Sequence, residues 1–220
     1  LRLAPAPMTL TLPAGPLVER VQIDPEMCEN ALKYVAPVLA EATSMQGAFS
    51  IQLDQCEIPL SDPAKGKLAG KFIIHSVEVG PGPLVRELAV LLNRASSVRL
   101  KRESVVTFKL ANKRVYHDGL ELEFPEVTIR TKGSVGFDQT LSLTIQMPIP
   151  PKWLAGTSLA DSLKNKSIQL PINGTLSRPQ LDRAEMAKQN KNLVGSAVRG
   201  VIQNEVGKQL DRLLGPPPSR

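Results

Sequence analysis

Hydrophobic and polar residues alternate with a period of two through most of the segment 104–176. Between Leu141 and Met147, for example, leucine, isoleucine and methionine occupy every second position, with serine, threonine and glutamine between them. Successive side chains of a β-strand point to opposite faces, so this pattern is typical of strands with one apolar and one polar face. The sequence therefore predicts a mainly β fold of the α+β class, in which an antiparallel amphipathic sheet is flanked by helices.

The first part of the chain shows the same strand pattern, with strands expected at 8–12, 18–23, 49–56 and 67–79. On the last of these, Phe72, Ile74 and Ser76 should share one face, because they are two residues apart. Further along the chain, turns are expected at Asp118-Gly119 and Asp138-Gln139, where turn-forming residues interrupt the alternation.

Helical signals separate these strands. Asp24, Pro25 and Glu26 predict a helix over 25–43, because a capping carboxylate, a proline at the first position and an acidic first turn favour a helix start. Pro37 should kink or shorten that helix. A short helix is expected over 84–93, and a C-terminal amphipathic helix over 182–214 that either caps the sheet or lies on a membrane. The chain is thus expected to contain an upstream strand–helix–strand module (1–100), a β region (101–181), and a C-terminal helix with a proline-rich tail (182–220).

An alternating set of apolar side chains in the β region defines the face that needs a cover. Two interpretations are open: the face is a core closed by the predicted helices, or it is a groove that binds an apolar ligand. The candidate lining residues are Val106, Phe108, Leu110, Leu120, Leu122, Phe124, Val127, Ile129, Val135, Phe137, Leu141, Leu143, Ile145 and Met147.

The composition and charge of the chain limit the kinds of partner that it is expected to bind. The chain is 42% hydrophobic but only 4% aromatic, so any core is aliphatic, and its net charge is +6. Basic residues gather between 94 and 114, where Arg99, Lys101 and Arg102 suit the phosphates of anionic lipid headgroups. The alternative is a solvated strand edge, where lysines deter pairing with other chains. Nucleic acid is not expected as a partner, because Phe108 is the only aromatic residue among these bases.

Few residues suggest chemistry. The two histidines, His75 and His117, lie in or beside predicted strands, and no histidine, cysteine or carboxylate cluster has the spacing of metal ligands. We therefore expect no catalytic, metal-binding or cofactor-binding residues, although a Ser/His/Asp site assembled from distant positions stays open. Cys28 and Cys56 would pair only if the fold brings helix and strand together.

Two elements of the β region resemble the C-terminal region of the AsmA family. The first is Gly133-Ser134-Val135-Gly136-Phe137-Asp138, followed by Leu141-Ser142-Leu143. The second is Leu170-Pro171-Ile172-Asn173-Gly174-Thr175-Leu176-Ser177-Arg178-Pro179. The resemblance covers about a third of the chain, residues 104–182. The segment from Pro148 to Trp153 departs from the family pattern, and so does the lack of an N-terminal membrane anchor within this chain.

The resemblance implies a groove-like sheet of the β-taco type with an apolar interior. It also implies a non-enzymatic periplasmic protein whose inner-membrane anchor lies outside this chain. Its expected partners are a phospholipid or other acyl lipid, a membrane surface and envelope proteins, and its expected role is lipid transfer in outer-membrane biogenesis. A scaffold of similar fold that carries no lipid is the alternative, because fold alone does not fix function.

Overall fold

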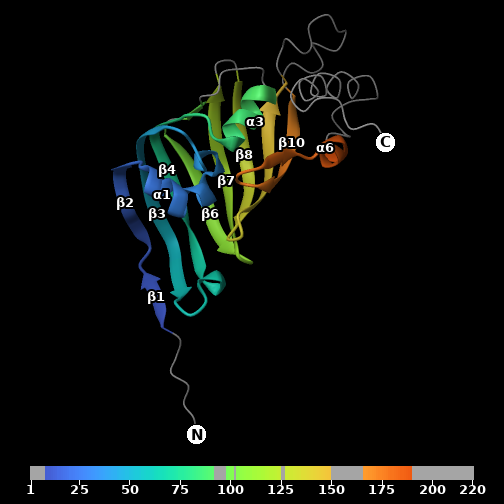
Figure 1. The fold of residues 1–220 in the computed structure, drawn as a ribbon. Helices are drawn as coiled ribbons and strands as arrows, with labels where there is room; N and C mark the ends of the chain where they lie inside the picture. Colours follow the sequence, from blue (N-terminus) through green and yellow to red (C-terminus); the bar gives the residue numbers. More distant parts are fainter. Residues whose placement is uncertain (1–7, 92–97, 102, 125–126, 150–165, 190–220) are drawn as a thin grey trace, which may run out of the picture.

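The protein folds as one antiparallel β-meander, seen in a computed structural model that describes residues 8–91, 98–101, 103–124, 127–149 and 166–189 (Figure 1). The eleven strands of these residues are β1 (Thr9–Leu12), β2 (Gly15–Gln22), β3 (Met45–Pro59), β4 (Lys67–Val79), β5 (Val98–Leu100), β6 (Ser104–Ala111), β7 (Arg114–Phe124), β8 (Val127–Gly136), β9 (Thr140–Pro148), β10 (Ser167–Thr175) and β11 (Pro179–Leu181). The helical segments are α1 (Pro25–Met27), η1 (Cys28–Leu32), α2 (Lys33–Val35), η2 (Pro37–Leu39), η3 (Pro63–Lys65), α3 (Pro83–Leu91) and α6 (Arg183–Gln189). The predicted mainly antiparallel β fold with flanking helices is confirmed.

Most strands pair with the strand that follows them in the sequence, except β1 with β2 and β5 with β6. β1 and β2 pair with successive parts of β3, and β5 and β6 both lie between β4 and β7. From β7 to β11 the order follows the sequence. The sheet continues without interruption across residue 100, so strands of the upstream segment and of the β region share one apolar face.

The helix expected over 25–43 is a chain of short helical segments. Its start matches the expected cap, because Asp24 Oδ1 accepts a hydrogen bond from the Met27 N–H (2.9 Å) and Pro25 takes the first helical position. A π-helical turn follows, α2 ends at Val35, and a 3-10 turn begins at Pro37, which has no N–H to continue an α-helix. The segment 36–40 is buried, and α2 contacts β7 and β8.

A second helix, α3, covers another part of the same layer. Leu84, Val85 and Leu88 are buried, and the helix contacts η2 and β11. Figure 1 shows α1 and α3 on the same side of the sheet. Part of the predicted C-terminal helix is present as α6, which begins at Arg183 and contacts β10; residues 190–214 lie outside the described residues.

A β-bulge corrects the turn expected at Asp118-Gly119. These residues lie inside β7, where Asp118 pairs with Lys132 and Leu120 with Thr131, so that Gly119 is the extra residue. Its φ of +94° is costly for residues with a Cβ, which explains the glycine. The hairpin turn comes earlier, at Asn112 and Lys113, which both have positive φ as type I′ turns require.

A second bulge corrects the expected position of Ser76. In β4, Ile74 pairs with Phe49 and Ser76 with Ala48, so His75 is the unpaired extra residue. The extra residue moves Ser76 to the solvent side and places Val77 in the core, where only 2% of its surface is exposed. Bulges therefore set which residues reach each face.

Candidate lipid-binding face

The apolar face of the sheet, defined here as the face that carries Leu122, Ile129 and Ile145, holds most of the predicted lining residues. Antiparallel pairing places Leu122 opposite Ile129, and Ile145 opposite Leu170. The buried members of the predicted set are Val106, Phe108, Leu120, Leu122, Phe124, Ile129, Val135, Leu141, Leu143, Ile145 and Met147. In this structure they form a packed core under the helical segments.

Three predicted lining residues lie at the borders of this face. Leu110 and Val127 are half-buried. Phe137 is 42% exposed, because β8 ends at Gly136 and the alternation ends with it. The Phe137 ring meets the Tyr34 ring of α2 edge-on, with the two ring centroids 5.9 Å apart. This pair closes the border between the sheet and its helical cover.

A histidine on the apolar face was not expected there from the sequence. His117 is 3% exposed and lies between Phe108 and Gly133 in the cross-strand row. Its Nε2 is 3.2 Å from Thr131 Oγ1, while Nδ1 has no partner among the described residues. Burial lowers the pKa of His117 to about 4, only partly opposed by the charge of Asp118. The imidazole is therefore neutral at pH 7.

Two of the three basic residues proposed for headgroups are paired with carboxylates. Arg99 Nε lies 3.6 Å from Glu78 Oε2, and Lys101 Nζ lies 2.6 Å from Glu121 Oε2. The hydrogen bond from Lys101 to Glu121 raises the pKa of Lys101. Arg102 lies outside the described residues. The alternative of a strand edge does not fit Arg99 either, because β5 pairs on both sides, with β4 and β7.

The first element of the family resemblance builds a hairpin turn. Arg114 Nε donates to Ser134 Oγ (2.8 Å) and Arg114 Nη1 donates to Thr140 Oγ1 (2.6 Å), which clamps β7, β8 and β9 together. Asp138 accepts hydrogen bonds from the Thr140 hydroxyl and N–H, and these bonds lower its pKa. A Cβ at Gly136 would collide with Asp138 Oδ1, so the glycine leaves room for this network.

The second element connects β10, β11 and α6. Thr175 Oγ1 accepts a hydrogen bond from the Arg178 N–H (3.2 Å) in the turn between the strands. Asp182 then accepts from the Asn173 side-chain amide (3.1 Å) and from the Glu185 N–H (2.9 Å), so one carboxylate joins β10 to the first turn of α6. Both elements thus have structural roles in this chain.

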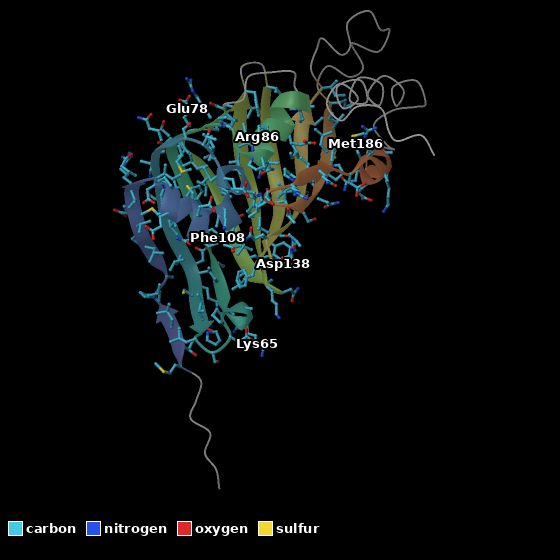
Figure 2. The ribbon with its side chains drawn as sticks, in the orientation of Figure 1. Lys65, Glu78, Arg86, Phe108, Asp138 and Met186 are labelled. Carbon is cyan, nitrogen blue, oxygen red and sulfur yellow. The ribbon has the colours of Figure 1, made fainter. Side chains whose placement is uncertain are left out.

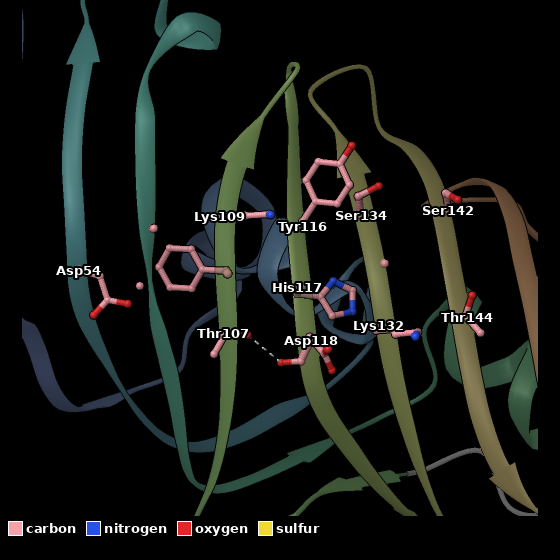
Figure 3. Close-up of a pocket in the computed structure, with 14 residues that line it drawn as sticks. Asp54, Thr107, Lys109, Tyr116, His117, Asp118, Lys132, Ser134, Ser142 and Thr144 are labelled. Carbon is pink, nitrogen blue, oxygen red and sulfur yellow. Dashed lines mark hydrogen bonds between the residues drawn. The ribbon is translucent and has the colours of Figure 1, made fainter. Parts of the chain in front are cut away.

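A hollow of about 660 Å³ lies on the polar face, opposite the helices (Figure 3). Its lining is mostly hydroxyl and charged groups, among them Lys109, Lys132, Tyr116 and Thr144. Lys109 Nζ lies 6.0 Å from the centroid of the Tyr116 ring. Phe108 and His117 also line the hollow, so it offers both polar and apolar contacts.

Of the seven large apolar side chains that are exposed among the described residues, four lie toward one end of the sheet, and Leu17, Met27 and Val105 lie elsewhere. The turns β3–β4 and β8–β9 lie at this end, as the labels Lys65 and Asp138 show in Figure 2. Leu60 is 54% exposed and Met8 is 75% exposed. The Leu60 N–H donates a hydrogen bond to the Met8 carbonyl. Leu10 and Phe137 are also exposed at this end. We call Met8, Leu10, Leu60 and Phe137 the apolar end.

The two cysteines are free and both are buried. Burial, together with Asp24 and Glu29, raises the pKa of Cys28 to about 12, so its thiol stays protonated and unreactive. Within the described ranges, no group of three or more histidine, cysteine or acidic residues has the arrangement of a metal site. The same residues include no helix of sufficient length and apolarity to cross a bilayer. Comparison of the chain with protein-family models, with curated proteins and with solved structures gave no match.

Proposed function

We propose that the protein binds the acyl chain of a phospholipid or a related lipid against its apolar face and passes lipid between membranes. The observation that carries the proposal is the cover of this face. The described part of the cover consists of the short segments α1 to η2 and the helix α3, not of a second sheet. Short helices gain most of their stability from packing, so such a cover can be displaced.

Burial of the acyl chain supplies the favourable free energy that offsets displacement of the cover. Each methylene removed from water contributes roughly 0.8 kcal/mol, so a chain of a dozen carbons contributes on the order of 10 kcal/mol. Leu39 and Val38 of the cover are fully buried in the closed structure. An acyl chain that displaces the cover would replace their apolar contacts with the sheet by contacts of its own. No catalytic group or cofactor is needed for this role.

The apolar end offers a contact with a bilayer. Met8 and Leu60 lie at the extremity of the sheet, beside the start of β1 and the end of β3, and their side chains are largely exposed. Insertion of these side chains among lipid tails would place the end of the apolar face next to the membrane. A periplasmic location, an anchor elsewhere in the protein and envelope partners rest on the resemblance to the AsmA family.

Native mass spectrometry after purification in mild detergent tests the binding. A phospholipid bound at a reproducible ratio is the expected result. Hydrogen exchange then locates it: lipid should accelerate exchange of the amides of Ala36 and Leu39, which bond within the cover (2.7 and 2.9 Å), and leave β9 and β10 unchanged. Tyr34→Ala, which removes the ring against Phe137, should increase lipid uptake, whereas Tyr116→Ala on the polar face is the matched control.

A scaffold with a permanently closed core is the second candidate, and the burial of Leu143 and Ile145 favours it. It predicts a folded protein that stays free of lipid and a cover whose exchange does not change when phospholipid vesicles are added. That pair of results would overturn the lipid-binding proposal.

A further inference from the structure

Three polar side chains from distant parts of the sequence meet on the polar face beside β2. Ser50 of β3 has its Oγ 2.8 Å from Nε2 of His75 in β4. On the other side of the ring, His75 Nδ1 lies 3.6 Å from Oε1 of Glu103, at the corner before β6. The serine, imidazole and carboxylate stand in the order that activates a serine hydroxyl as a nucleophile.

Two bulges direct these groups toward one another. His75 is the extra residue of β4, and on the other side of Ser50 the pairing of β2 with β3 is irregular between Val18 and Val21. Arg20, inside that irregularity, has φ +48°, and its N–H donates to Ser50 Oγ (2.9 Å). Bulges that re-aim side chains in this way are frequent next to active sites.

The hydrogen bonds determine where the protons lie. The Arg20 N–H already donates to Ser50 Oγ, so the hydroxyl proton of Ser50 is available to donate to His75 Nε2. An imidazole that accepts at Nε2 carries its proton at Nδ1, which faces the Glu103 carboxylate. Nδ1 has no hydrogen-bond partner among the described residues, so the N–H is free to bond to this carboxylate after a small movement.

A hollow of about 600 Å³ opens beside the pair. Ser50 and His75 both line it, together with Pro16, Val18, Ile51 and Ile73, of which Val18 and Ile51 also pack against the core. Arg20 is the cationic residue of its lining and Glu19 the acidic one. The hollow therefore combines a nucleophile–base pair, a surface for an alkyl group and a cationic residue in its lining.

We propose that Ser50 is the nucleophile of a serine esterase-type site, with His75 as its general base and Glu103 as a positioning residue. The substrate class is a carboxylic ester with an apolar acyl group, which the part of the hollow at Pro16 and Ile73 would accommodate. The site is on the opposite side of the sheet from the proposed lipid face, and it does not depend on lipid transfer.

The chemistry balances without a cofactor. Ser50 Oγ bonds to the ester carbonyl carbon while its proton moves to His75 Nε2, and the bond from that carbon to the alkoxy oxygen breaks. The imidazolium gives its proton to the leaving alkoxide, which departs as an alcohol. Water then attacks the acyl-serine as His75 takes its proton, and the acid leaves as Ser50 Oγ recovers a proton. Arg20, the cationic residue of the lining, is the group that would stabilise the negative charge on the carbonyl oxygen in both steps.

Labelling with a fluorophosphonate, which forms a covalent bond with activated serines, tests the site in the full chain. Intact mass should show one adduct, and peptide mapping should place it on Ser50. His75→Ala should slow labelling by about 100-fold or more, the size of effect that general-base catalysis provides. Ser76→Ala, beside His75 but exposed, is the matched control and should label as the unchanged protein does. The absence of an adduct, or one on another serine, would overturn the proposal.

Two further variants separate chemistry from folding. Ser50→Cys keeps a side-chain acceptor for the Arg20 N–H, and its new thiol should react with iodoacetamide at least about tenfold faster than a free cysteine at pH 6, because His75 removes its proton. The buried Cys28 and Cys56 give little background. If the Ser50→Cys thiol reacts no faster than free cysteine, the proposal is likewise overturned.

The carboxylate has its own test. Glu103→Gln should slow fluorophosphonate labelling, because the amide no longer balances the charge that His75 acquires when it takes the serine proton, and Glu103→Asp should restore the rate. A purely structural Glu103 would give Glu103→Gln the labelling rate of the unchanged protein, and this outcome would remove Glu103 from the site.

Discussion

The two histidines lie on opposite faces of one sheet, and their surroundings differ in almost every respect. His117 is 3% exposed between Phe108 and Gly133, keeps one hydrogen bond to Thr131 and is neutral at pH 7. His75 lies beside a hollow, between a serine and a carboxylate. The comparison shows that a buried imidazole on the apolar face costs stability when it is protonated, whereas one at a bulge on the polar face is placed for proton transfer.

The largest expected effect comes from a comparison of two neighbouring residues whose side chains lie on opposite faces of the sheet. Leu143→Asp should lower the free energy of unfolding by about 4 kcal/mol or more, because it places a carboxylate where only 3% of the side chain is exposed. Ser142→Asp, on the exposed side of the same strand, should change it by no more than about 0.5 kcal/mol. Urea denaturation measures both. If Leu143→Asp unfolds at the same urea concentration as the unchanged protein, the apolar face is open to solvent.

The next effect comes from the pH dependence of stability at His117. Because its pKa is lowered to about 4 in the folded state from 6.5, the unfolded chain binds the proton first as the pH falls. This contribution is zero above pH 6.5 and reaches a loss of about 3 kcal/mol near and below pH 4. Urea midpoints at pH 7.5 and 4.5 should therefore lie closer together in His117→Leu than in the unchanged protein. An equal separation in both proteins would contradict the burial of the neutral ring.

A smaller effect tests the β-bulge at Gly119, which allows the residues on both sides of it in β7 to direct apolar side chains into the core. Gly119→Ala should cost about 2 kcal/mol, because φ is +94° and the new Cβ would lie 2.9 Å from the Val105 carbonyl oxygen. Gly15→Ala is a useful comparison, since its φ is also positive but no atom lies within 4 Å of the added Cβ. Thermal unfolding should rank Gly119→Ala as the less stable variant, and the reverse order would place the strain elsewhere.

The smallest effect concerns membrane contact. Met8→Ser together with Leu60→Ser should reduce co-sedimentation with anionic vesicles several-fold, because both side chains are exposed at the apolar end. Arg99→Gln with Lys101→Gln should reduce it by less than about twofold, since Glu78 and Glu121 already compensate these charges. A larger loss for the second pair would move the membrane contact from the apolar end to the basic residues.

Alternation was sufficient to predict β9 and its buried side. Leu141, Leu143, Ile145 and Met147 repeat without interruption, and the structure buries all four on one face. The break of the first helix near Pro37 was predictable for the same local reason, because a missing N–H acts on its own turn.

The features that need register were not predictable from local pattern. A single extra residue at Gly119 or at His75 reverses the face of everything that follows, and nothing in the neighbouring letters marks it as a bulge. Ser50 and His75 are 25 residues apart, and their contact depends on the pairing of β3 with β4. Phe137 was expected on the apolar face because it continues the alternation of β8. The strand ends one residue earlier, at Gly136, and Phe137 is exposed.

The sequential order of the strands has a consequence for how such a protein changes its size. Because each strand from β7 to β11 lies beside the one that precedes it along the chain, a hairpin can be added at the β11 side or removed without rearranging the others. Each such hairpin changes the width of the apolar face by about 9 to 10 Å, which is twice the spacing of paired strands. The dimension of the surface offered to a hydrocarbon is therefore set in discrete steps by the number of hairpins.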